Sequence, residues 1–274
     1  MAPPVKISLL MENQAGKSSV DKIFLAQHGL SLFVEANKRI LFDTGASGLF
    51  LHNAELLGID LETTDVIVLS HGHWDHTDGL KSFQPAGTKK ILLAHPQIFV
   101  DRHGATGVYN GAAFTEQQAA ESFELVLTKE PYRLDDHIYF LGEIPRVNDF
   151  EAQQTDFFYL DGPEKRPDFI MDDSALAIRT DKGLVIVTGC SHAGICNIVE
   201  YAKKVCSENR VNTVVGGFHL LGNSEQLERT IAYFMKNPVG QLYPMHCTGF
   251  PALARFYQEF GIKKLGAGDT IEID

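Results

Sequence analysis

Hydrophobic and polar positions follow two recurring patterns along this chain. Short runs of Val, Ile and Leu, such as residues 66–69, have the length and the β-branched composition of buried strands. Longer segments with apolar residues at helical spacing, such as residues 195–206, predict helices. In chain order, the pattern predicts strands at 31–35 and 39–43, a helix at 49–57, strands at 66–69, 90–94, 175–179 and 184–188, a helix at 195–206, a strand at 211–215, a helix starting near Asn223, and strands at 241–244 and 270–273.

The predicted strands and helices fall into two similar stretches. Two β-rich halves with helices outside predict two sheets packed face to face and covered on both sides, which is a four-layer αβ/βα sandwich within an α/β fold. Residues 104–170 interrupt this pattern with Gly, Pro, aromatic and charged clusters, and their strand and helix signals are short. We therefore expect a single domain spanning residues 1–274, with an insertion at about 104–170 that serves as a lid or a substrate-binding region.

The segment that most strongly indicates chemistry is His71-Gly72-His73-Trp74-Asp75-His76, directly after the strand at 66–69. Three imidazoles and one carboxylate within six positions, at the end of a buried strand, are typical of a metal-binding loop. Because His71 and His73 are two residues apart at a strand end, both can face one ion. The turn that follows brings Asp75 and His76 toward a neighbouring position, where the carboxylate suits a second ion or a bound water.

Three later strand ends also carry histidine. Cys190 and His192 lie in Thr-Gly-Cys-Ser-His-Ala-Gly after the strand at 184–188, His219 follows the strand at 211–215, and His246 follows the strand at 241–244. If these ends converge on the edge of the sandwich that holds His71, the chain supplies enough ligands for two ions.

Composition narrows the classes of partner. The net charge of −11 argues against a nucleic-acid binder, because affinity for a phosphate backbone depends on clustered Lys and Arg. No apolar run approaches the length of a membrane span, and residues 1–6 lead into a strand-like segment without a signal-peptide core, so we expect a cytoplasmic protein with no membrane partner. The cysteines form no C-x-x-C pair and are expected to be reduced; they are Cys190, Cys196, Cys206 and Cys247.

Four motifs in this order resemble the metallo-β-lactamase superfamily over nearly the whole chain. They are Phe42-Asp43-Thr44-Gly45, HGHWDH at 71–76, TGCSHAG at 188–194 and PMHCTG at 244–249. The resemblance implies that His71 and His73 bind one metal, and that Asp75, His76 and His246 bind the second. It also implies that Asp43 braces the ligand loop through hydrogen bonds.

Within this superfamily, the motifs GCSHAG, GGFHL and HCTG resemble a branch of dihydropterin-related synthases and metal-dependent hydrolases. The chain departs from the common pattern before residue 175, where the usual histidine is absent and Met171-Asp172-Asp173 stands instead. Asp172, Asp173 and His192 are the candidates to replace that ligand. Cys190 occupies the place of the usual bridging aspartate, where it is either a thiolate ligand that favours zinc or a buried structural thiol.

Two divalent ions point first to hydrolysis. Zinc is the expected metal, with manganese, iron and magnesium as alternatives, and such a pair lowers the pKa of a bridging water and polarises a substrate oxygen. Asp75 would orient the water, and His219 would either protonate the leaving group or simply cap its strand. An ester, lactone, thioester or phosphodiester of a small molecule fits this chemistry.

Two alternatives remain. The branch resemblance implies a synthase that joins a pterin methyl group to an aminobenzene ribofuranosyl phosphate with loss of diphosphate. The other is a di-iron redox protein, because similar His and carboxylate ligands hold two irons in other relatives of the superfamily. A pterin ring calls for aromatic walls, for which the candidates are Trp74, Phe157, Phe158, Tyr159 and Phe169. The remaining histidines are predicted to be surface or packing residues outside the metal shell: His28, His52, His95, His103 and His137. The insertion could also contact a second copy of the chain in a homo-oligomer.

Overall fold

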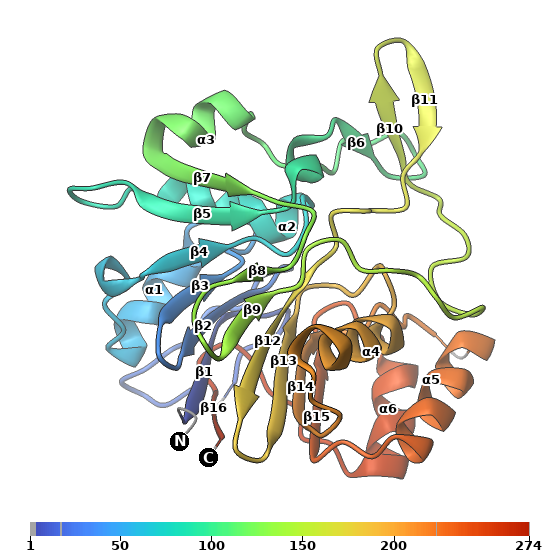
Figure 1. Ribbon diagram of the computed structural model, residues 1–274. Helices are drawn as coiled ribbons and strands as arrows, with labels where there is room; N and C mark the ends of the chain where they lie inside the picture. The colour runs from blue at the N-terminus through green and yellow to red at the C-terminus, as the bar shows by residue number, and fades with distance from the viewer. Residues whose placement is uncertain (1–3, 17, 223, 274) are drawn as a thin grey trace.

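Two β-sheets pack face to face at the centre of the computed structural model, which describes residues 4–16, 18–222 and 224–273 (Figure 1). The first sheet has the strand order β16 (Thr270–Ile273), β1 (Val5–Met11), β2 (Ser31–Glu35), β3 (Arg39–Phe42), β4 (Val66–Val68), β5 (Lys90–Ala94) and β7 (Phe123–Leu127). The second has the order β15 (Gln241–Met245), β14 (Val211–Gly217), β13 (Gly183–Thr188), β12 (Ala175–Thr180), β9 (Ile138–Phe140) and β8 (Tyr132–Arg133).

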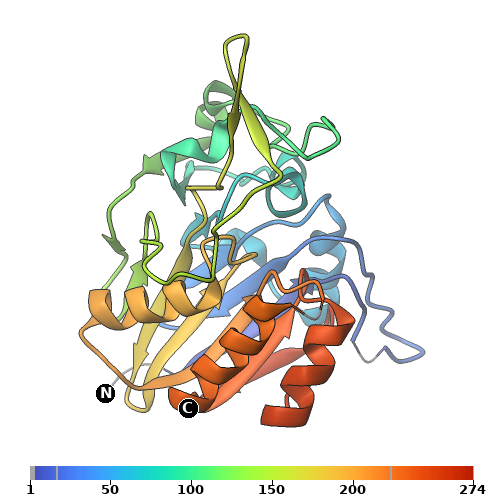
Figure 2. The ribbon, with the colours of Figure 1, turned by 90° about the vertical axis from the view of Figure 1, so that its right-hand side faces the viewer.

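Helices cover the outer face of each sheet (Figures 1 and 2). The first sheet carries α1 (Leu49–Leu57) and α3 (Glu116–Ser122), and the second carries α4 (Ile195–Cys206), α5 (Glu225–Lys236) and α6 (Phe250–Phe260). Short helical turns complete the chain: η1 (Leu61–Thr63), α2 (Trp74–Thr77), η2 (Asp78–Ser82) and η3 (Pro96–Phe99). This confirms the predicted αβ/βα sandwich.

Alternation along the strands produces the layers. In β3, Phe42 packs into the core between the two sheets, whereas Leu41 packs with Phe50 of α1 on the outer side. In β13, Val187 faces the core between the sheets and Ile186 packs under the helices of the second half. Each sheet is therefore apolar on both faces, so a polar functional site is expected at the ends of the strands.

The segment 104–170 is only in part the insertion that the sequence predicts. Its strand β7 completes the first sheet, and β8 and β9 complete the second. The part that projects from the body is the hairpin of β10 (Phe158–Asp161) and β11 (Glu164–Pro167), which pairs with β6 (Arg102–His103) (Figure 2). The prediction was too wide because short strands at sheet margins have weak hydrophobic signals.

Two sequence predictions touch residues that the structure does not describe. The first three residues, where no signal peptide is predicted, and Asn223, near the predicted start of a helix, lie outside the described residues. The helix itself begins at Glu225, where the Ser224 side chain accepts a hydrogen bond from the Leu227 amide as a helix cap. Among the helices of the described residues, none is long and apolar enough to cross a membrane.

Candidate metal centre

The carboxyl ends of two sets of parallel strands deliver the predicted site residues. Strands β3 and β4 are parallel in the first sheet, and β13, β14 and β15 are parallel in the second. The HGHWDH loop follows β4, while Cys190, His219 and His246 follow β13, β14 and β15 in turn. Because the two sheets pack against each other, these ends meet at one edge of the sandwich.

The first group of potential ligands consists of His71, His73 and His192. The Nδ1 atom of His73 lies 3.0 Å from Nε2 of His71 and 3.2 Å from Nε2 of His192. Burial lowers the pKa of all three imidazoles well below 6.5, so each is neutral at pH 7. Three neutral nitrogens therefore converge on one point, as a tridentate cradle for a cation requires.

The second group consists of Asp75, His76 and His246. Nε2 of His246 lies 3.0 Å from Nε2 of His76 and 3.3 Å from Oδ2 of Asp75. Nε2 of His76 lies 3.8 Å from Oδ2 of Asp75. Cys190 Sγ lies 3.2 Å from Nε2 of His76 and also clusters with His71, so the thiol stands between the two groups.

In the second group, His246 is neutral before a cation binds, whereas His76 and the Cys190 thiol must each lose a proton to bind one. Burial disfavours charge on His76, but the carboxylates of Asp75 and Asp43 outweigh it and raise the pKa of His76 to about 9. Burial lowers the pKa of His246 to about 4, and it raises the pKa of the Cys190 thiol well above its usual value. A thiolate at Cys190 therefore needs a cation beside it. Imidazole nitrogen, carboxylate oxygen and thiolate sulfur together are the donor set that zinc accepts most readily.

Asp43 holds the ligand loop from beneath. Its Oδ1 accepts a hydrogen bond from the Ser70 amide at 2.7 Å, and its Oδ2 accepts from Ser70 Oγ and from His76 Nδ1, each at 2.7 Å. Because Ser70 Oγ donates its proton to Asp43, it accepts from Nδ1 of His71 at 2.9 Å. Both histidines are thereby fixed with Nε2 free to face the site.

Asp172 and Asp173 support neighbouring backbone and do not reach the cluster. Asp172 accepts a hydrogen bond from the Gly72 amide at 2.7 Å and another from Arg102 at 2.7 Å, and Asp173 accepts one from the Ala193 amide at 2.9 Å. Neither belongs to any of the His, Cys and carboxylate clusters found among the described residues. Of the three candidates for the missing ligand, the structure brings only His192 to His73.

His246 is held by residues from the first sheet that the sequence did not single out. Its backbone amide donates to Glu12 Oε1 at 2.8 Å, and its Nδ1 donates to Asn13 Oδ1 at 3.1 Å. Both residues lie just after β1, and no local sequence pattern marks them. A search for polar residues at every strand end of the first sheet would have found them.

His28 is exposed, as predicted for a surface residue, but it lies beside the second group. Its Nε2 lies 3.1 Å from Oδ2 of Asp75, and the hydrogen bond between them raises the pKa of His28. It forms one of the possible metal-holding groups with Asp75 and His246, and its exclusion from the metal shell stays a prediction. The loop after β1 carries it there over a distance that spacing along the chain cannot reveal. The other four histidines belong to none of the clusters in the described chain: His52, His95, His103 and His137.

His219 lies beside His192, with a separation of 4.2 Å between the ring centroids. Burial lowers the pKa of His219, so at pH 7 the ring is neutral and suited to accept a proton. The predicted alternatives for His219, a proton donor or a structural cap of its strand, stay predictions. Among the described residues, His219 belongs to none of the possible metal-holding groups.

Two adjoining cavities open over this centre. The first, of about 350 Å³, is lined by Trp74, Asp75 and His246 together with the residues it shares with the second. The second, of about 380 Å³, is lined by Phe169, Gln154, Asp156 and Gln226, among others. The shared residues are Phe157, His192, His219 and Leu221. Of the aromatic residues predicted to contact a ring, Phe158 and Tyr159 line neither cavity, because they lie in the projecting strand β10.

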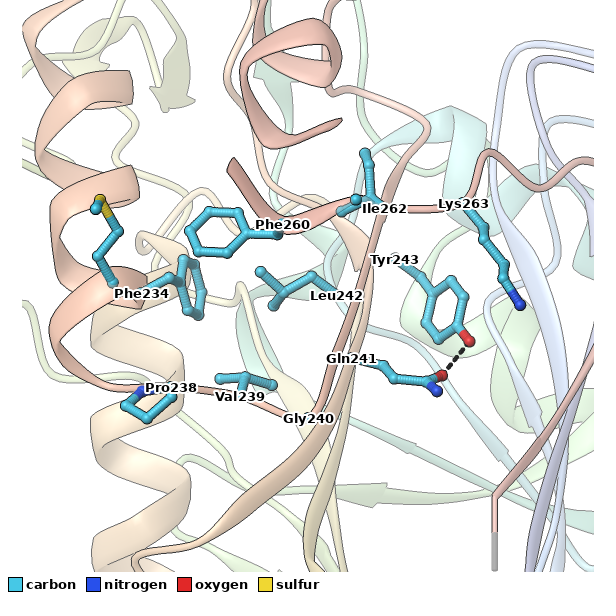
Figure 3. Close-up of a pocket in the computed structure, with 12 residues that line it drawn as sticks. Phe234, Pro238, Val239, Gly240, Gln241, Leu242, Tyr243, Phe260, Ile262 and Lys263 are labelled. Carbon is cyan, nitrogen blue, oxygen red and sulfur yellow. Dashed lines mark hydrogen bonds between the residues drawn. The ribbon is translucent and has the colours of Figure 1, made fainter. Parts of the chain in front are cut away.

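A third cavity, of about 310 Å³, lies at the opposite end of β15 from His246 (Figure 3). Phe234, Leu242 and Phe260 form its apolar wall, and Tyr243 donates a hydrogen bond to Gln241 at its side. Its lining includes no His, Cys, Asp or Glu, so it offers nothing that could hold a metal.

The chain is similar in sequence to one protein family and to individual proteins within it. Residues 27–202 match the family model described as the metallo-beta-lactamase superfamily. The chain is 38% identical over 287 residues to the 7,8-dihydropterin-6-methyl-4-(beta-D-ribofuranosyl)-aminobenzene-5'-phosphate synthase of Methanocaldococcus jannaschii, covering 98% of this chain and 96% of that protein. It is 36% identical over 254 residues to an uncharacterised protein of the same organism, covering 92% and 94%.

The fold of the chain is also similar to that of solved structures. A metal-dependent hydrolase of the beta-lactamase superfamily superposes with a TM-score of 0.86 at 31% identity, covering 98% of this chain and 99% of that one. A diphosphatase of the PhnP family superposes with a TM-score of 0.58 at 16% identity, covering 100% and 98%, which shows a shared fold.

Proposed function

This chain belongs to the metallo-beta-lactamase superfamily, and from that premise we propose that it is a two-metal synthase that couples a dihydropterin to an aminobenzene ribofuranosyl phosphate with release of diphosphate. Members of the superfamily bind metal ions, and a relative 38% identical along nearly its whole length carries the name of that synthase. The observation that carries the proposal is the pair of cavities that adjoin at Phe157, His192 and His219, because a coupling reaction needs room for two substrates beside one centre.

In this proposal His71, His73 and His192 hold the first ion, and Asp75, His76 and His246 hold the second, with the Cys190 thiolate between them. Zinc is the favoured metal because a thiolate is a soft ligand and the imidazoles are borderline ones. When bound, the two ions supply positive charge that neutralises the phosphoryl oxygens of the leaving group.

In this proposal the first cavity takes the diphosphate group and the aminobenzene acceptor, and the second takes the pterin ring. The diphosphate faces the His and Asp side chains of the first cavity, where the metals supply the positive charge. The pterin ring lies in the second cavity between the apolar surfaces of Phe157 and Phe169. The polar side chains of Gln154, Asp156 and Gln226 provide hydrogen-bond partners for the edge of such a ring.

The coupling exchanges one bond for another at a single carbon. The bond between the pterin methyl carbon and the diphosphate oxygen breaks with its electron pair on diphosphate, and the aminobenzene nitrogen forms a new bond to that carbon. The nitrogen must then lose a proton. His219, which is neutral and lines both cavities, accepts it. Phe157, which lines both cavities, supplies an apolar wall beside the reacting carbon.

Hydrolysis is the second candidate. The structural relative at 31% identity is named as a metal-dependent hydrolase, and Asp75 lines the first cavity, where it can orient an attacking water. The substrate is then an ester or phosphoester of a small molecule, and no acceptor amine is required.

One assay separates the two reactions. The metal-loaded protein is incubated with a dihydropterin methyl diphosphate, with and without the aminobenzene ribofuranosyl phosphate, and diphosphate and coupled product are measured by mass spectrometry. Diphosphate release that requires the acceptor supports the synthase. Release without the acceptor supports hydrolysis, and no release with either mixture contradicts both reactions on this substrate.

A His219→Gln variant tests the proton acceptor. We expect turnover to fall roughly 10²-fold or more, with unchanged metal content, because Gln cannot accept the proton. Metal analysis of the same sample decides the redox alternative, since iron as the dominant metal would favour it.

A further inference from the structure

A second cysteine lies beside the metal cluster. Cys247 directly follows His246 at the end of β15, and its Sγ lies 3.4 Å from the backbone oxygen of Cys190. The two sulfurs and a ring nitrogen of His246 all lie within 4.8 Å of one another. These distances are close to those between the ligands of a single tetrahedral ion.

The fold leaves space for this thiol. Strands β13 and β15 flank β14, so Cys190 and Cys247 approach each other across the end of β14. That end is Gly217, where a Cβ atom would stand 2.5 Å from the Cys247 sulfur. The glycine therefore keeps the space for the Cys247 thiol open, and Cys247 and the buried Cys190 both line the cavity over the centre.

We propose that Cys247 supplies a second thiolate, beside Cys190, to the ion that His246 helps to hold, and that this pair of thiolates makes the position selective for a thiophilic divalent ion such as zinc over manganese or magnesium. This inference rests on the metal centre of the proposed function. Binding deprotonates each thiol, and the two protons pass to solvent as the two sulfur–metal bonds form. Two soft ligands in one position disfavour ions that prefer oxygen.

Cobalt(II) substitution tests the proposal without reference to turnover. Metal-free protein is titrated with cobalt, and the sulfur-to-cobalt charge-transfer absorption in the near ultraviolet is recorded for wild type, Cys190→Ser, Cys247→Ser and Cys206→Ser. Cys206 is the matched control, because it is buried at the end of α4 and belongs to no cluster. Circular dichroism verifies that each variant is folded.

We expect Cys190→Ser and Cys247→Ser each to remove about half of the charge-transfer intensity, and Cys206→Ser to remove none. Cys247→Ser should also lower the preference for zinc over manganese roughly tenfold in competition titrations. Full intensity in Cys247→Ser, or failure of the wild type to bind cobalt, would overturn the inference.

The result of the cobalt experiment does not depend on the result of the dihydropterin assay. Halved intensity in Cys247→Ser supports the second thiolate even where the dihydropterin assay yields no product. Loss of intensity in Cys190→Ser alone rejects Cys247 as a ligand and leaves the metal centre and the synthase proposal standing.

Discussion

The two halves of the molecule contribute to the candidate metal centre in different ways. The first half supplies four of the potential ligands from a single segment, residues 71–76, which follows β4 and continues into α2. The second half supplies Cys190, His192 and His246 from the ends of two strands that are not adjacent in its sheet. A local cluster owes its geometry mainly to one turn, whereas a dispersed cluster depends on the correct packing of a whole sheet.

Residues next to strands of each sheet form hydrogen bonds with a ligand loop of the other sheet. Asp172, which precedes β12 of the second sheet, accepts from Gly72 in the first half's loop. Glu12 and Asn13, which follow β1 of the first sheet, hold His246 of the second. Each half therefore positions a ligand loop of the other, and the centre is sensitive to how the two sheets pack.

Loss of a ligand from the local loop should have the largest effect. We expect His73→Ala to abolish loading of the first ion and to lower activity roughly a thousandfold or more, with the fold intact, because His73 contacts both His71 and His192. Inductively coupled plasma mass spectrometry and circular dichroism measure the two properties. The exposed His52→Ala on α1 is the control, and full metal content in His73→Ala would contradict the assignment.

Removal of the support within the first half should come next. Asp43→Asn keeps the shape of the side chain but loses the negative charge that Ser70 and His76 bind. We expect metal affinity to fall about 10- to 100-fold, measured by competition with a chelator. Asp65→Asn, which alters an exposed aspartate at the other end of β3, should leave the affinity unchanged. Equal losses of metal affinity in both variants would show that Asp43 does not specifically support the ligand loop.

Proton release distinguishes the two halves. His76 of the local loop has a pKa raised to about 9 and is protonated at pH 7 without metal, whereas the pKa of His246 is lowered to about 4 and that ring is already neutral. Metal must displace the His76 proton, and this proton alone should raise the metal affinity about tenfold from pH 7 to pH 8. The raised pKa also stabilises the metal-free fold below pH 6.5, and this stabilisation is lost as the pH rises toward 9.

Calorimetric titration in buffers of different ionisation heat counts the protons released. The measurement is made in the Cys190→Ser, Cys247→Ser double variant, which removes both thiol protons from the count. An affinity that does not change between pH 7 and pH 8 would show that His76 is neutral before metal binds.

The smallest effects should come from the two supports that cross between the sheets. Asn13→Ala removes the acceptor for His246 Nδ1, and Asp172→Asn weakens the hold on Gly72. We expect each to lower metal affinity by a few-fold to about tenfold. If the sheets position the loops jointly, the double variant should lose more or less than the product of the single losses. Independent effects would argue that each loop is held by its own half.

Much of the fold could be predicted from the sequence, and the misses have a common cause. The strands at 31–35 and 90–94 and the helices at 49–57 and 195–206 have the predicted bounds, because each carries a clear hydrophobic period. Helix α6 was not predicted, and β7, β8 and β9 were assigned to an insertion. These strands are short or partly exposed, so their place in the sheets depends on partners far away in sequence.

The sequence by itself determined the local loop at 71–76 and the order of the strand-end motifs, because neighbouring residues share one turn and strand ends are marked by their flanking pattern. Tertiary structure decided that His192 and neither Asp172 nor Asp173 reaches His73, and that His28 contacts Asp75 and Asn13 contacts His246. Such choices depend on which strand ends become neighbours when two sheets pack. Spacing along the chain does not predict that packing, because the packing depends on burial of the core between the sheets.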